Sequence, residues 1–89
     1  MDEKRLDELY ERLAATGERP VERTASRWLG EAEAVAGDIV RGDPDPDVRR
    51  ERLAKVEDLL GHVETTGDEQ ADEHVDAARE LVAELLSDG

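Results

Sequence analysis

Cysteine and phenylalanine are absent from this chain of 89 residues, and tryptophan and tyrosine occur once each. The absence of cysteine excludes disulfide bonds and thiolate metal sites. With only two aromatic side chains, a hydrophobic core has to be built from leucine, valine and alanine. Because a chain of this length buries only about 60–65% of the surface that its unfolded form exposes, we expect one small domain with a thin core.

Long apolar runs are missing as well. No window approaches the 18 or more apolar residues of a membrane-spanning helix, and no apolar run follows the charged residues 1–5, as it would in a secretory signal peptide. The sequence therefore predicts a cytoplasmic protein.

Positive charge is scarce. There are 12 basic residues against 25 acidic ones, which gives a formal net charge of −13. The excess is uneven, because residues 1–42 carry a net −3 and residues 43–89 a net −10. A surface of this sign argues against nucleic acids and anionic membranes as partners.

The composition has three notable features: a high content of acidic residues, only two lysines, and small aliphatic side chains in place of large ones. In these respects it resembles the uncharacterised small acidic helical proteins of haloarchaea. That resemblance implies a cytoplasm of molar salt, where the Debye length is about 3 Å and like charges repel little. Low salt is then expected to loosen the fold. Intrinsic disorder is the alternative explanation of such a composition, and sustained apolar periodicity argues against it.

Residues 21–40 carry the clearest periodic pattern, with apolar side chains spaced three and four positions apart over five turns. This spacing predicts an amphipathic helix with a wide buried arc. Its apolar positions are Val21, Ala25, Trp28, Leu29, Ala32, Val35, Ala36, Ile39 and Val40. We expect Trp28, the only tryptophan, to point into the core.

Similar stripes predict helices over residues 2–16, about 46–65 and about 69–87. Gly17 and Gly42 are expected to end the first two helices, and Pro20 to open the second. Residues 43–47, Asp-Pro-Asp-Pro-Asp, form a linker in which Asp45 and Pro46 suit the N-cap and first turn of the third helix.

Short connections between these helices force antiparallel neighbours. The sequence therefore predicts an all-α fold, an up-down antiparallel four-helix bundle built from two αα-hairpins. Hairpin one covers residues 1–42 and hairpin two residues 48–89 of a single domain.

An internal repeat is consistent with two hairpins. A shift of fifty residues aligns the apolar positions of the two halves and brings residues 16–18, Thr-Gly-Glu, onto residues 66–68, Thr-Gly-Asp. Duplication is one explanation of the match. The other is that any two helical hairpins of similar length share their phase.

A row of small residues between arginines lies opposite the apolar arc of residues 21–40. Small side chains let another helix approach closely, and the arginines could pair with carboxylates across the contact. The row predicts a homodimer interface, or a surface for another helical protein, formed by Arg23, Arg27, Gly30, Ala34, Gly37 and Arg41. The alternative is ordinary surface composition.

An acidic stripe lies on the last helix, with carboxylates one turn apart at Glu69, Asp72, Glu73 and Asp76, followed by Glu80. The spacings Glu69-x-x-Asp72 and Glu73-x-x-Asp76, with Glu8-x-x-Glu11, resemble the carboxylate pairs of all-α nucleotide pyrophosphatases of the MazG type. That resemblance implies Mg²⁺ ligands and metal-dependent nucleotide hydrolysis. In that family, however, the pairs lie across one short hairpin, whereas here they lie on different hairpins. Weak binding of K⁺ or Mg²⁺ by a solvated face is the simpler interpretation.

The remaining candidates are structural. Neither His62 nor His74 lies in the Glu-x-x-His pattern of di-iron bundles, so both are expected to be partly buried structural residues. The basic run at residues 49–55 lacks interleaved aromatic residues, and its arginines are expected to pair with nearby acids. We therefore favour a non-catalytic interaction or structural module that self-associates and needs no cofactor, with the nucleotide hydrolase as the alternative.

Overall fold

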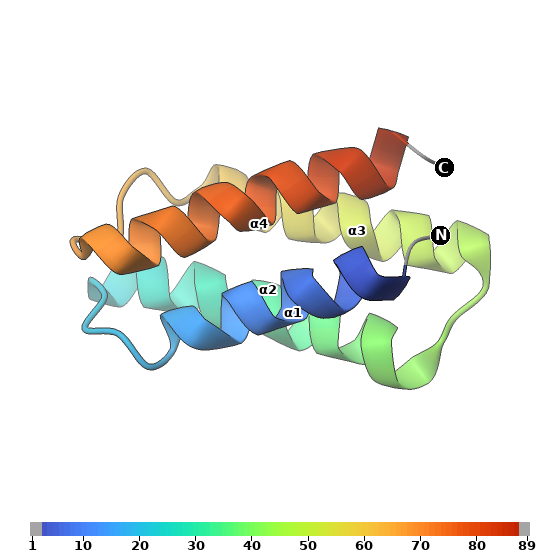
Figure 1. The fold of residues 1–89 in the computed structure, drawn as a ribbon, viewed down its shortest axis with the longest axis horizontal. Coiled ribbons are helices and arrows are strands. Elements are labelled where there is room, and N and C mark those ends of the chain that lie inside the picture. Colours follow the sequence, from blue (N-terminus) through green and yellow to red (C-terminus); the bar gives the residue numbers. More distant parts are fainter. Residues whose placement is uncertain (1–2, 88–89) are drawn as a thin grey trace.

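The computed structural model describes residues 3–87 and contains four helices (Figure 1). These are α1 (Glu3–Thr16), α2 (Arg23–Gly42), α3 (Pro46–Gly61) and α4 (Glu69–Ser87). Residues 3–87 contain no strand. The predicted all-α class is confirmed.

The helices run alternately up and down and occupy the corners of a bundle about 35 Å long (Figure 1). Helix α1 packs against α2 and α4, and α3 packs against the same two helices. The diagonal pairs, α1 with α3 and α2 with α4, do not contact each other. The predicted antiparallel four-helix bundle is confirmed, and the outer faces of α2 and α4 point to opposite sides of the molecule.

The core is built from aliphatic side chains of all four helices, as the composition predicts. Its buried members are Leu6, Leu9, Leu13, Ala25, Leu29, Ala32, Ala36, Ile39, Leu53, Val56, Leu59, Leu60, Val63, Val75, Ala78, Leu81, Val82 and Leu85. Burial of this apolar surface is what stabilises the bundle, at roughly 25 cal/mol for each Å² removed from water.

The apolar arc of α2 is narrower than predicted. Val40 is 36% exposed, and Val21 lies before the helix and is half-buried. Trp28 does not point into the core. It packs on the core edge, where its ring stacks on His62 with centroids 4.3 Å apart and planes 15° from parallel. His62 itself is exposed rather than partly buried.

The ends of the second helix differ from prediction. Helix α2 begins at Arg23, because the Glu22 carboxylate caps it by accepting hydrogen bonds from the Thr24 and Ala25 amides at 3.1 and 3.3 Å. Pro20 therefore lies outside the helix. Helix α2 extends through Gly42, and its C-cap is Asp43, whose φ of 42° places it in the left-handed region.

The third helix starts as predicted, with Asp45 at the N-cap position and Pro46 in the first turn. Its end differs, since α3 stops at Gly61 rather than near residue 65. The guanidinium of Arg79 on α4 donates to the carbonyl oxygens of Leu60 and Val63 beyond this end. The Leu60 carbonyl also accepts from the Val63 amide at 3.1 Å, so Arg79 adds a second donor at this carbonyl and supplies one to the Val63 carbonyl, which lies beyond the helix. The predicted start of the first helix at Asp2 lies outside the described residues.

The two turns that the repeat aligns have different structures. Thr16 ends α1 and its hydroxyl donates to the Leu13 carbonyl at 2.6 Å. Thr66 instead follows α3 by several residues and contacts the start of α4. Gly67 has a φ of 81°, whereas Gly17 is not among the glycines with positive φ. The similarity of the two hairpins therefore lies in their helices and not in their turns.

None of the helices within residues 3–87 is long and apolar enough to cross a membrane.

Candidate functional site

The six residues of the predicted interface lie on α2, and five of them are exposed. Arg23, Arg27, Gly30, Ala34 and Arg41 are exposed. We call these five residues the outer face of α2. Gly37 is buried.

Gly37 belongs to the contact between α1 and α2. A Cβ at this position would lie 3.1 Å from Cε1 of Tyr10 and 2.8 Å from Nη2 of Arg41. Glycine thus allows the Tyr10 ring to approach the backbone of α2, and Arg41 to fold back along its own helix. Arg41 also lies 3.7 Å from the carboxylate of Asp38. The prediction that Gly37 lies on the open interface is therefore wrong, because Gly37 is buried.

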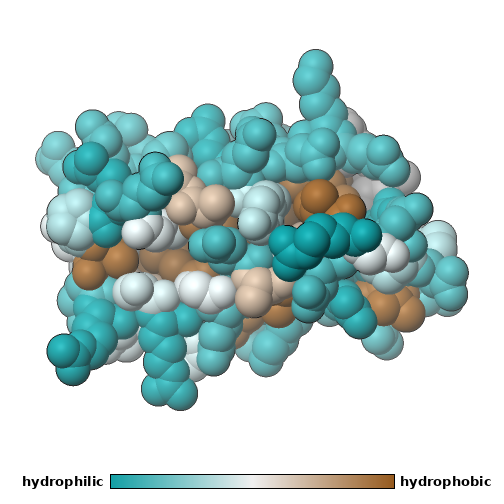
Figure 2. Space-filling model, turned by 90° about the horizontal axis from the view of Figure 1, so that it is seen from below, coloured by the Kyte–Doolittle hydropathy of each residue, from teal (hydrophilic) through white to brown (hydrophobic). Residues whose placement is uncertain are grey.

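Gly30 is in a different environment. A Cβ added there would meet no atom within 4 Å, and Ala34, one turn further along the helix, is exposed. Figure 2 shows apolar and neutral residues in the middle of the side formed by α1 and α2, with hydrophilic side chains between them and along both edges. The centre of the outer face of α2 thus carries no side chain at Gly30 and only a methyl group at Ala34, and its arginines lie on both sides of these two residues along the helix.

Replacement of each glycine by alanine should separate these two environments. We expect Gly30→Ala to raise the free energy of unfolding of the monomer by up to about 1 kcal/mol, because alanine is the better helix former and meets no obstacle. Gly37→Ala is expected to gain less or to destabilise, because Tyr10 has to move. Urea denaturation of both variants in dilute solution measures the difference. Equal gains would contradict the assignment of Gly37 to the packed contact.

The predicted metal ligands on α4 do not gather into one set. Glu69, Glu73 and Asp76 are exposed, together with Glu80, and we call these four residues the acidic face of α4. Asp72 is half-buried and turned toward the loop before the helix. Within the described residues, no group of three or more carboxylates and histidines is placed to hold a metal ion.

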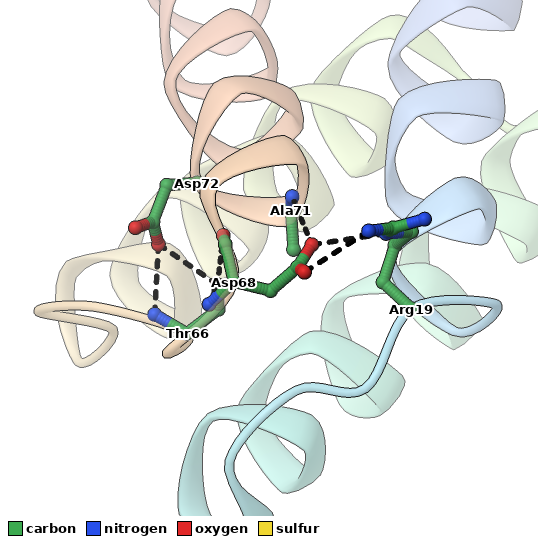
Figure 3. A network of polar contacts seen from close by, with 5 residues as sticks. All are labelled: Arg19, Thr66, Asp68, Ala71 and Asp72. Carbon is green, nitrogen blue, oxygen red and sulfur yellow. Dashed lines mark hydrogen bonds and ion pairs between the residues drawn. The ribbon is translucent and has the colours of Figure 1, made fainter.

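Asp72 belongs instead to a polar network at the end of the bundle (Figure 3). Its carboxylate accepts hydrogen bonds from the amide and the hydroxyl of Thr66, both at 2.8 Å. These hydrogen bonds hold the pKa of Asp72 below its ordinary value, and the bond from the Thr66 amide has the larger effect. Thr66 is fully buried, so this charged acceptor satisfies a hydroxyl that has no access to solvent.

The same network joins the two hairpins. The Arg19 guanidinium donates from Nε and Nη2 to the two carboxylate oxygens of Asp68, at 3.0 and 3.1 Å. Asp68 also accepts from the Ala71 amide at 2.9 Å, which caps the start of α4. The Arg19 hydrogen bond and this cap lower the pKa of Asp68. A backbone hydrogen bond of 2.7 Å from Glu22 to the carbonyl of Thr66 adds a second link.

The sequence predicts that residues 66–68 lie between the last two helices, but it does not predict this link between the loops. The spacing of Asp68 and Ala71 is that of an N-cap and its third helical residue, which is a recognisable pattern. Nothing in the pattern pairs Asp68 with Arg19, 49 positions earlier in the chain. The arrangement fixes two loops and presents no open reactive group, so its role is structural.

Other predicted polar residues also have structural partners. Arg49 pairs with the linker residue Asp43 at 2.5 Å, as the expectation for the basic run stated. His74 is half-buried and its Nδ1 lies 3.2 Å from Nη1 of Arg12. Because arginine can only donate, His74 accepts at Nδ1.

Residues 5–89 match a family model described as Domain of unknown function (DUF8152). The chain belongs to this family. No curated protein and no solved structure matches it. Because the description of the DUF8152 family names no activity, the functional argument depends on the geometry of the chain itself.

Proposed function

We propose that this protein is a non-catalytic helical interaction module that self-associates through the outer face of α2. One observation supports this most directly. At the centre of that face Gly30 is open and Ala34 is exposed, so the backbone of a second helix could approach α2 closely. The arginines at both ends of the face could then pair with carboxylates of the partner.

The site geometry does not favour the hydrolase alternative. Asp72, one of its four proposed metal ligands, accepts hydrogen bonds from Thr66 and caps a loop. The remaining carboxylates of α4 project from an exposed face rather than into a cavity.

We also propose that the module works in a cytoplasm of high salt. The formal net charge of −13 on 89 residues supports this setting, because molar salt screens the repulsion between two associating copies. In dilute buffer the same charge opposes association.

Sedimentation equilibrium in molar KCl tests the proposal. We expect the apparent mass to rise with protein concentration to at least twice the 9.9 kDa of the chain. Gly30→Leu should weaken association, because the side chain fills the open centre of the face without a clash inside the monomer. Ala54→Leu, at an exposed position of α3, is the matched control and should associate like the unmodified protein.

A mass of one chain at every concentration would overturn self-association. Equal association of the Gly30 and Ala54 variants would show that another surface is used.

A further inference from the structure

We infer that the surface that meets the outer face of α2 is the acidic face of α4 in a second copy of the chain. The inference rests on the proposed self-association and specifies its geometry. It makes the contact head-to-tail, with two different faces, rather than a symmetric contact of α2 with α2.

Charge is the first argument. The outer face of α2 carries three arginines, and the acidic face of α4 carries four carboxylates, Glu69, Glu73, Asp76 and Glu80. Among residues 3–87, Arg23 has no ion-pair partner, and neither do Glu73 and Glu80. A symmetric α2–α2 contact would offer these arginines fewer carboxylates, because among the acidic residues of α2 between Arg23 and Arg41 only Glu31 and Asp38 are exposed, and Asp38 already lies 3.7 Å from Arg41.

The position of the two faces in the bundle is the second argument. Helices α2 and α4 occupy diagonal corners and do not contact each other (Figure 1). One chain therefore cannot pair its own two faces, and each copy keeps one of each available. Contacts between unlike faces generate a ring if the rotation closes and an open chain if it does not.

The lengths of the two faces are the third argument. At a rise of 1.5 Å per residue, Glu69 and Glu80 are about 16 Å apart along α4. Arg27 and Arg41 are about 21 Å apart along α2. The acidic face is therefore shorter than the span from Arg27 to Arg41, and Gly30 and Ala34 lie within this span, where a second helix needs small side chains.

Charge reversal on each face separately tests the inference. One variant carries Arg23→Glu and Arg27→Glu, and the other carries Glu73→Arg and Glu80→Arg. We expect each variant alone to associate at least about tenfold more weakly than the unmodified protein, because close charge pairs across an interface become repulsive. An equimolar mixture should associate again, because the unmodified acidic face of α4 in the first variant complements the unmodified outer face of α2 in the second.

Two control variants on α3 separate this effect from net charge. Arg50→Glu with Arg52→Glu matches the first change, and Glu51→Arg with Glu57→Arg matches the second, all at exposed positions. Both controls should associate like the unmodified protein. Circular dichroism of every variant checks that the bundle is folded.

The outcomes distinguish the two proposals. Unchanged association of the α4 variant, or a mixture that stays monomeric, would overturn the head-to-tail contact while self-association stands. An unmodified protein that stays monomeric at every concentration would overturn both proposals.

Discussion

Leu9→Ala is expected to lower the free energy of unfolding by about 2–5 kcal/mol. The Leu9 side chain is fully buried on α1, the helix that packs against both α2 and α4. Its truncation loses apolar burial and leaves a cavity that the surrounding helices fill only in part. Because a domain of this size has a total stability of about 5–15 kcal/mol, the variant should lose a large share of it. Urea denaturation followed by circular dichroism measures the change.

Val40→Ala is the matched comparison, since valine 40 is 36% exposed although the sequence pattern places it in the core. We expect a cost within about 0.5 kcal/mol, as is usual at surface positions. A cost equal to that of Leu9→Ala would mean that Val40 is buried in solution, and that the face assigned to α2 is rotated.

The fold could be predicted because it depends on a repeated pattern. Each helix repeats its apolar spacing over several turns, so a single misplaced residue does not change the assignment. The error at Val40 shows the limit of this argument. The pattern gives the direction of the buried face, but its width depends on where the neighbouring helices lie. Leu9 on α1 and Leu53 on α3 lie in the middle of the buried faces of their helices. Val40 lies at the edge of the buried face of α2.

Helix ends were harder to predict, because partners distant in the sequence decide them. Helix α3 stops at Gly61, and Arg79 from α4 donates to carbonyl groups at this end. Nothing in residues 61–65 alone indicates that partner. The start of α2 is a different case, because a local cap, Glu22, defines it instead of Pro20. The positions of Asp45 and Pro46 at the start of α3 were predicted correctly, although the Asp45 side chain makes no capping hydrogen bond.

The candidate interface was predictable in outline and wrong in one detail. The helical period places Gly30 and Gly37 on the same side of α2, but only Gly30 is open. The difference comes from Tyr10 of α1, whose ring covers Gly37. The two glycines thus have separate roles, one on the outer face of α2 and one in the packing of α1 against α2.

The spacing of Asp72 illustrates how a metal motif and a helix cap can look alike. Carboxylates at the start of a helix are favoured by the helix dipole and by its unpaired amides. Asp68 and Asp72 satisfy such needs in the first turns of α4 and in the preceding loop. The Glu69-x-x-Asp72 pattern is therefore explained, at Asp72, by the loop contact.

Thr66→Val is expected to lower the free energy of unfolding by about 1–3 kcal/mol at neutral pH, because it removes a buried hydroxyl and leaves its partners unsatisfied. That hydroxyl accepts from the Asp68 amide at 3.1 Å and lies 2.8 Å from the Asp72 carboxylate. Valine has nearly the same shape, so packing changes little. Thr65→Val is the neighbouring control, at an exposed position where the hydroxyl lies 3.2 Å from Asp72, and its cost should be smaller.

The cost of Thr66→Val should also depend on pH. The amide and hydroxyl of Thr66 hold the pKa of Asp72 below its ordinary value of 3.8, so this carboxylate contributes stability above the value of the unfolded chain. That contribution is lost as the pH falls through the lowered pKa of the folded state. The difference between Thr66→Val and the unmodified protein is therefore expected to be widest near neutral pH and to narrow below about pH 3.8. Thermal unfolding across this range measures the difference, and one that is constant with pH would show that the hydroxyl acts independently of the Asp72 charge.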